Sequence, residues 1–135
     1  IVEELKELSE KEGAAQDEIR LCYAKGLVNL SSKQEEAGAK ASVEKLKELS
    51  EKEGARQDEI RLCYAKGLAN LSSKQEEAGA EESVEKLKEL SEKEGAAQDE
   101  IRLCYAKGLA NLSFKQNEYE TEINMDKLRR LSEVK

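Results

Sequence analysis

Hydrophobic residues recur along this chain at the spacing of helical turns. In one segment Val43, Leu46 and Leu49 follow each other at i, i+3 and i+6, with lysines and glutamates between them. This spacing is typical of a narrow apolar stripe on an amphipathic helix. Ser42 stands where an N-cap belongs, and Gly54 stands where helices commonly end in a left-handed residue. The pattern therefore predicts a short helix between these two residues.

A second and wider apolar pattern runs from about Asp17 to Gln34. Its hydrophobic residues fall on two arcs of a helix, with Ile19, Cys22, Tyr23, Leu27 and Leu30 on one arc and Leu21, Ala24 and Val28 on the other. Two arcs predict a helix that packs between neighbours on two sides. Gly26 and its copies Gly67 and Gly108 lie mid-helix, where glycine costs about 1 kcal/mol relative to alanine. Close approach of another helix would explain them.

The stretch between the two patterns, Glu35–Ala41, contains Gly38 and is short enough to fold the helices back into antiparallel pairs. Gly13 and Gly95 are expected to end the short helices of the other copies. No segment alternates apolar and polar residues with a period of two, so we expect no strands. The pattern predicts an all-α chain of about seven helices, a leading short helix and three long–short pairs. The pairs are expected to stack into a solenoid, because one narrow stripe cannot bury itself alone.

The repeat has a period of 41 residues, read from the spacing of Cys22, Cys63 and Cys104 (63 − 22 and 104 − 63 are both 41). Within a single repeat domain, 1–135, the units are 2–42, 43–83 and 84–124, followed by a partial fourth unit, 125–135, as a C-terminal capping helix. Such close copies indicate either recent duplication of a natural array or consensus design. The start at Ile1 instead of Met indicates a fragment or an engineered chain.

The third copy departs from the others near its end, which favours a natural origin. Its added apolar bulk lies at Phe114, Tyr119, Ile123 and Met125, where the second copy has Ser73, Ala78, Glu82 and Val84. These residues predict either a cap that folds over the end of the stack or a docking patch for a further domain. Asn124 is expected to be the N-cap of the last helix.

Composition excludes several function classes. With 39% charged residues and a net charge of −7, the chain is a poor partner for nucleic acid, whose phosphates require Lys and Arg. No apolar run approaches the length of a membrane span. Histidine is absent, and no phosphate loop, nucleophile motif or clustered cysteines appear, so we expect no enzyme, no metal and no cofactor.

The tyrosines and cysteines have a structural interpretation. Tyr23, Tyr64 and Tyr105 are expected to pack between helices. Equivalent cysteines on stacked helices lie too far apart for a disulfide bond. They are expected to be small buried residues in a reducing compartment, which predicts a cytoplasmic protein.

The run from Leu21 to Leu30 resembles the first helix of a tetratricopeptide repeat, with Ala24 at its small position and Leu27 at its large one. The short segment that starts at Val43 would be the second helix. The unit is longer than the usual length of about 34 residues and lacks the usual proline, so HEAT and armadillo pairs are the nearest alternatives. The resemblance implies a right-handed α-solenoid whose first helices line a concave groove for peptides or partner helices, a scaffold rather than a catalyst.

A polar stripe between the two apolar arcs repeats in every unit. Its lysine–asparagine pairs are Lys25 and Asn29, Lys66 and Asn70, and Lys107 and Asn111. They form a candidate ladder for an acidic peptide or its C-terminal carboxylate, similar to the carboxylate clamp of some tetratricopeptide proteins, although that family varies the residues between repeats. The alternative is a solvated polar face in which the asparagines bond to a neighbouring helix.

Two functions follow from these patterns. The first is a protein–protein interaction scaffold of tetratricopeptide type. The second is a structural or spacer array, natural or designed, with no ligand of its own. In either case the chain is expected to be a monomer or to self-associate weakly end to end.

Overall fold

The computed structural model consists of α-helices joined by turns in the residues it describes, which are 2–10, 16–52, 54, 56–93, 95, 97–116 and 118–133, with the backbone alone for 2, 118, 119 and 121. Its helices are α1 (Val2–Ser9), α2 (Gln16–Lys33), α3 (Glu36–Ser50), α4 (Gln57–Lys74), α5 (Glu77–Ser91), α6 (Gln98–Ser113) and α7 (Glu118–Ser132). The prediction of a leading short helix, three long–short pairs and no strands is confirmed for these residues.

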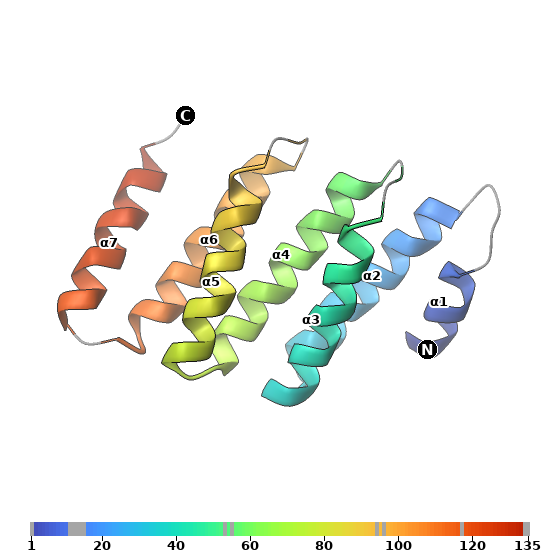
Figure 1. The fold of residues 1–135 in the computed structure, drawn as a ribbon, viewed down its shortest axis with the longest axis horizontal. Coiled ribbons are helices and arrows are strands. Elements are labelled where there is room, and N and C mark those ends of the chain that lie inside the picture. Colours follow the sequence, from blue (N-terminus) through green and yellow to red (C-terminus); the bar gives the residue numbers. More distant parts are fainter. Residues whose placement is uncertain are drawn as a thin grey trace.

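The helices form two layers (Figure 1). The long helices α2, α4 and α6 pack side by side, and each of α3 and α5 lies in the angle between two of them. Among the described residues, the backbones of α1, α3, α5 and α7 do not come close to one another. Chain neighbours are thus spatial neighbours throughout, and the two termini lie at opposite ends of the stack.

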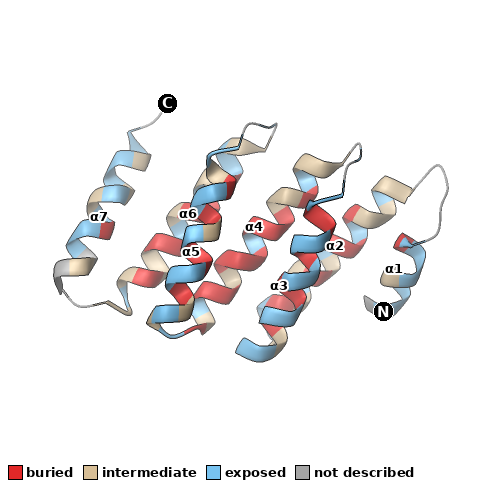
Figure 2. Ribbon diagram, viewed as in Figure 1, coloured by how far each residue is buried: buried red, intermediate tan, exposed pale blue. Residues whose placement is uncertain are grey.

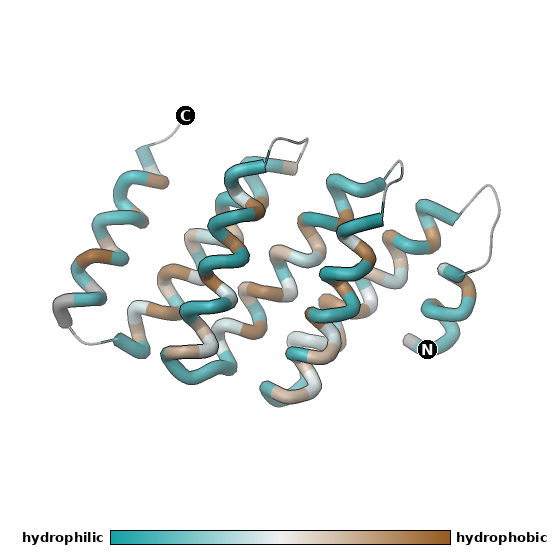
Figure 3. Tube along the Cα trace, in the orientation of Figure 1, coloured by the Kyte–Doolittle hydropathy of each residue, from teal (hydrophilic) through white to brown (hydrophobic). Residues whose placement is uncertain are grey.

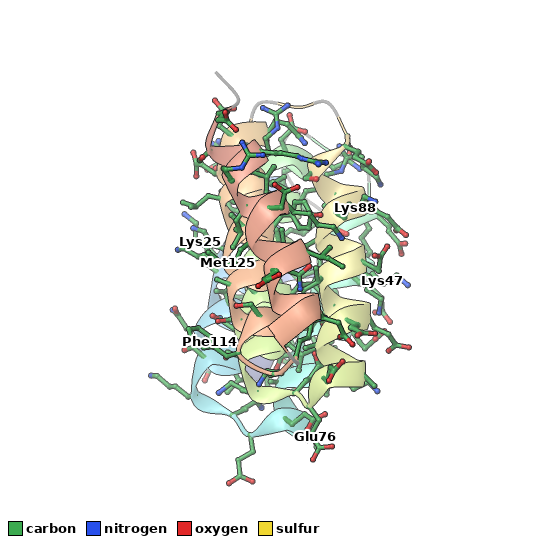
Figure 4. All side chains as sticks on the ribbon, turned by 90° about the vertical axis from the view of Figure 1, so that its left-hand side faces the viewer. Lys25, Lys47, Glu76, Lys88, Phe114 and Met125 are labelled. Carbon is green, nitrogen blue, oxygen red and sulfur yellow. The ribbon has the colours of Figure 1, made fainter. Side chains whose placement is uncertain are left out.

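The stack has two broad sides, seen on edge in Figure 4. We call the side of α2, α4 and α6 that carries Lys25, Lys66 and Lys107 the long-helix face. We call the side of α3 and α5 that carries Lys47 and Lys88 the short-helix face. Lys25 points away from Lys47 and Lys88 in this view, so the two faces present different surfaces to solvent.

Helix α3 begins earlier than predicted. The stretch Glu35–Ala41 is not a loop, because α3 starts at Glu36 and includes Gly38. Its residues are mainly Glu, Ala and Lys, which are strong helix formers and outweigh a single glycine. The unit boundaries at Val43, Val84 and Met125 therefore fall inside helices.

The serine that was predicted to be an N-cap has a different role. Ser42 is buried within α3, and its hydroxyl donates a hydrogen bond to Oε1 of Gln34 at 2.7 Å. Asn124 was likewise wrongly predicted as an N-cap; it is buried within α7, and its amide donates to Oε1 of Gln116. These side-chain bonds tie α3 to Gln34, which directly follows α2, and α7 to Gln116, which lies shortly after α6. The turn between α2 and α3 is two residues long.

The predicted left-handed glycine caps are also wrong. No described glycine has a positive φ, and Gly13 lies outside the described residues. A Cβ built on Gly54 would lie 2.5 Å from Oδ1 of Asp17, and one on Gly95 would lie 2.8 Å from Oδ1 of Asp58. These glycines leave space for an aspartate of the preceding long helix.

The mid-helix glycines do mark close approaches, as predicted. A Cβ on Gly67 would lie 2.7 Å from Cδ1 of Leu46, and one on Gly108 would lie 2.7 Å from Cδ1 of Leu87. Both leucines are 0% exposed, so each fills the notch that a glycine leaves on the next long helix. The contact between each buried leucine and its glycine sets how closely α3 packs on α4 and how closely α5 packs on α6.

Burial is concentrated in the middle of the stack. Figure 2 shows buried residues throughout α2–α6, whereas α1 and α7 are largely exposed or half-buried. Hydrophobic positions recur singly along the helices instead of forming continuous runs (Figure 3). Tyr23, Tyr64 and Tyr105 are buried in this core, which confirms their predicted packing role.

Candidate functional site

The structure gathers part of the predicted ladder around one hollow on the long-helix face. This hollow, about 420 Å³ in volume, lies between α2 and α4. It is lined by Leu21, Lys25, Val28, Asn29, Glu59, Leu62, Cys63 and Lys66. We call it the α2–α4 hollow. It places the ammonium-bearing side chains of Lys25 and Lys66 beside leucine and valine side chains.

The lysines and asparagines of the ladder have different surroundings. Lys25, Lys66 and Lys107 are exposed. Asn70 is half-buried and donates its amide to Oγ of Ser31 at 3.3 Å. Asn111 donates to Oγ of Ser72 at 3.2 Å. These two asparagines join adjacent long helices, as the alternative interpretation of the stripe predicted.

A further link between repeats was not predicted from the sequence. Lys74 donates through Nζ to the backbone carbonyl of Ser32 at 3.2 Å, and Lys115 donates to the carbonyl of Ser73 at 3.4 Å. Each of these lysines follows a stripe asparagine by four residues, which places Lys74 on the same side of α4 as Asn70 and Lys115 in the turn just after α6. That spacing is the signal that could have identified them.

The chemistry of the α2–α4 hollow favours an anionic, partly apolar ligand. Two cationic side chains, Lys25 and Lys66, face one carboxylate, Glu59. Burial raises the pKa of the Cys63 thiol, while Lys66 and Lys25 oppose that rise. Burial therefore favours the neutral thiol of Cys63 over the reactive thiolate.

The three cysteines are unpaired, as expected. Cys63 and Cys104 are buried, but Cys22 is exposed, so its predicted burial is wrong. The reason is its place in the stack: α4 and α6 each pack on a preceding long helix, and no described helix covers α2 in that way. Sequence alone gives the three residues the same surroundings.

A second hollow opens on the short-helix face, where the backbones of α3 and α5 stay apart. It has a volume of about 440 Å³ and is lined by residues of α3, α4 and α5, among them Arg61, Tyr64, Lys86 and Glu89. Burial, with the carboxylates Glu44, Glu51 and Glu89, raises the pKa of Tyr64 to about 12. Its charges are mixed in sign, so it favours no single class of ligand.

Three carboxylates gather at the start of α5. The ligand atoms of Glu77, Glu81 and Glu120 lie within 4.8 Å of one another, the one such group among the described residues. Exposed acidic groups often cluster without binding a metal ion, and we assign no metal site here.

Comparison with models of known protein families, with curated proteins and with solved structures finds no match to this chain. The resemblance to tetratricopeptide repeats therefore stays a prediction that rests on the residues of the repeat. No described helix combines the length and hydropathy of a membrane span.

Proposed function

We propose that this chain is a protein–protein interaction scaffold that binds an acidic peptide or helix on its long-helix face. The observation that carries the proposal is the α2–α4 hollow, where Lys25 and Lys66 flank apolar side chains. A glutamate- or aspartate-bearing segment with an alternating apolar residue matches both features. The unpaired cysteines support a reducing, cytoplasmic setting.

The lysines carry recognition in this proposal, and the asparagines position the lysines. Asn70 and Asn111 hold adjacent long helices at a fixed spacing through their bonds to Ser31 and Ser72. Successive lysines are therefore separated by the spacing between neighbouring long helices. A ligand with regularly spaced acidic groups would engage several of them at once, which raises its overall affinity.

The test uses fluorescent peptides of alternating glutamate and leucine, with lysine–leucine peptides as the opposite-charge probe. Fluorescence anisotropy would compare the chain with a variant carrying Lys25→Glu, Lys66→Glu and Lys107→Glu. We expect the variant to bind the acidic peptide about tenfold more weakly or worse, because three ion pairs of up to about 1 kcal/mol each are lost. Circular dichroism would show that both chains fold alike.

A matched control places the same change on the opposite face. The variant Lys45→Glu, Lys47→Glu and Lys88→Glu has the same net charge and alters exposed residues of α3 and α5. We expect it to bind like the parent chain. Equal losses in both variants would reveal net-charge attraction without a site, and equal binding in all three chains would overturn the proposal. Capture from cell extract with the same three chains would then identify the natural partner.

The spacer alternative has one observation in its favour. The amides of Asn70 and Asn111 are engaged between repeats, so the polar stripe has an architectural use without any ligand. If neither peptide binds and no extract protein is lost from the triple variant on the long-helix face, a spacer array becomes the better function.

A further inference from the structure

The two ends of the stack expose matching halves of the interface that joins neighbouring repeats. At one end, no long helix among the described residues packs on the side of α2 that faces away from α4. Cys22 is exposed there, whereas its copies Cys63 and Cys104 are 6% and 5% exposed beneath the preceding repeat. Ile19 is half-buried, while its copy Ile60 is buried. These are the residues with which α4 and α6 pack on the repeat before them.

The opposite end exposes the surface that receives a long helix. Leu103 is 54% exposed on α6, whereas its copy Leu21 is buried where α4 covers α2. Met125 is 52% exposed on α7, whereas its copies Val43 and Val84 are buried. Leu103, Ala106, Leu128 and Leu131 line a hollow of about 500 Å³ between α6 and α7, together with Asp99, Arg102 and Ser132. The α6 part of this surface repeats the sequence of α2, and α7 keeps Leu128 and Leu131 at the places of Leu46 and Leu49 of α3.

Polar groups at the two ends match as well. Inside the chain, Asn70 and Asn111 donate to Ser31 and Ser72 of the preceding long helix. The remaining asparagine of the series, Asn29, is exposed at one end of the stack. The serine that would receive it, Ser113, lies near the C-terminal end of α6 and bonds to its own helix as Ser72 does.

From this match we propose that copies of the chain assemble head to tail, with α2 of one copy packing on α6 and α7 of the next as α4 packs on α2 and α3. The occupant of the α6–α7 surface is a second copy, because that surface continues an interface already made twice within the chain. Such a contact is heterologous and does not close on itself, so it extends into longer assemblies.

The assembly requires α1 to leave its place, because α7 of the neighbouring copy takes the same position against α2. The two helices are related by the repeat, with Leu5 and Leu8 of α1 matching Leu128 and Leu131 of α7. Helix α1 has only 8 residues and leaves Leu8 exposed, whereas α7 has 15. In the assembly, α7 of one copy therefore replaces the shorter α1 of its neighbour. The apolar stripe of α7 then packs on α2 of that neighbour as well as on its own α6.

The first experiment is sedimentation velocity over a wide range of protein concentration. We expect the sedimentation coefficient of the parent chain to rise with concentration. Leu103→Lys blocks the receiving surface and Cys22→Arg blocks the inserting one, and each variant alone is expected to stay a monomer. Ala41→Glu, which copies Glu82 of the next repeat into α3, is the control and should associate like the parent chain. A parent chain that stays monomeric at every concentration would overturn the proposal.

Mixing the two variants tests the head-to-tail geometry. An equimolar mixture of Leu103→Lys and Cys22→Arg retains one intact copy of each surface, so we expect a dimer that grows no further. Association of either variant by itself would show a like-to-like contact and would overturn the proposal. Circular dichroism of both variants confirms that a loss of association is not a loss of folding.

Hydrogen exchange tests the exchange of α1 for α7. At concentrations where the parent chain assembles, amides of Val2–Ser9 should lose protection while those of α7 gain it. Protection of α1 that stays unchanged during assembly would overturn the helix exchange. All of these measurements are made without peptide ligand, so their outcome is independent of the function proposed above.

Discussion

Helices α2 and α4 are 18 residues long and differ only at Val28 and Ala69, yet they occupy different environments. Helix α4 has a long helix on each side, whereas α2 has one on a single side. The same cysteine is therefore exposed in α2 and buried in α4. The comparison teaches that the burial of a residue in this chain depends on the position of its repeat in the stack and cannot be deduced from the local sequence.

The largest difference between the two helices is expected from the leucines that pack on their mid-helix glycines. Leu46 of α3 is completely buried against Gly67, whereas its copy Leu5 of α1 is half-buried against Gly26. Leu46→Ala should lower the free energy of unfolding by about 2–5 kcal/mol, the range for a buried leucine. Leu5→Ala should lower it by about 1 kcal/mol, since less surface is lost. Urea unfolding followed by circular dichroism would measure both, and equal losses would contradict the comparison.

The glycines themselves should respond with opposite signs. A Cβ on Gly67 would meet Cδ1 of Leu46 at 2.7 Å, and Leu46 is completely buried. Gly67→Ala should destabilise by about 1 kcal/mol, because overpacking outweighs the gain in helix propensity. Gly26→Ala meets Leu5 at 3.1 Å, and this half-buried side chain can shift. That variant should be stabilised by up to about 1 kcal/mol, and a loss of stability there would refute the idea of a looser α1.

A smaller difference is expected from the stripe asparagines. Asn70→Ala removes the hydrogen bond to Ser31 and should destabilise by about 1 kcal/mol. Asn29 is exposed, so Asn29→Ala should raise stability by a few tenths of a kcal/mol through helix propensity alone. Thermal unfolding of the two variants would give the difference. If Asn29→Ala were as damaging as Asn70→Ala, the bond between repeats would not be the cause.

The last effect is absent at neutral pH and is confined to alkaline solution. The pKa of Tyr64 rises from its ordinary value of 10.0 to about 12 in the folded chain, chiefly by burial. The folded state thus favours the neutral phenol, and this contribution to stability is complete below pH 10 and lost as the pH rises from 10 to 12. Tyr64→Phe should flatten the fall in unfolding free energy over this interval. Tyr23→Phe serves as the comparison in α2, and an unchanged slope in Tyr64→Phe would exclude Tyr64 as a source of the pH dependence.

Much of the fold follows from the sequence, because a period of 41 residues and two kinds of helical stripe leave little freedom in the order of elements. The glycine notches were also predictable, since Gly67 interrupts a strong helix without a local reason. The start of α3 could not be predicted, because Ser42 has the spacing of an N-cap but bonds to the side chain of Gln34, eight residues earlier. A tertiary hydrogen bond of this kind leaves no periodic signal.

The candidate site was predictable in part. The sequence placed Lys25 and Lys66 on one stripe, and the structure brings them to one hollow. It could not separate the lysines from Asn70 and Asn111, because the partner serines belong to a different repeat. The hollow on the short-helix face was not predicted, because it lies between α3 and α5 and the sequence does not show how far apart these two helices are.

That missing contact has a mechanical consequence. The long helices α2, α4 and α6 pack side by side in a continuous layer. Helices α3 and α5 pack on this layer but not closely on each other. Bending that spreads α3 away from α5 breaks no packing between them, whereas bending in the other direction presses them together. We therefore expect the array to bend more easily in the direction that spreads the short helices apart, and a longer array to curve further.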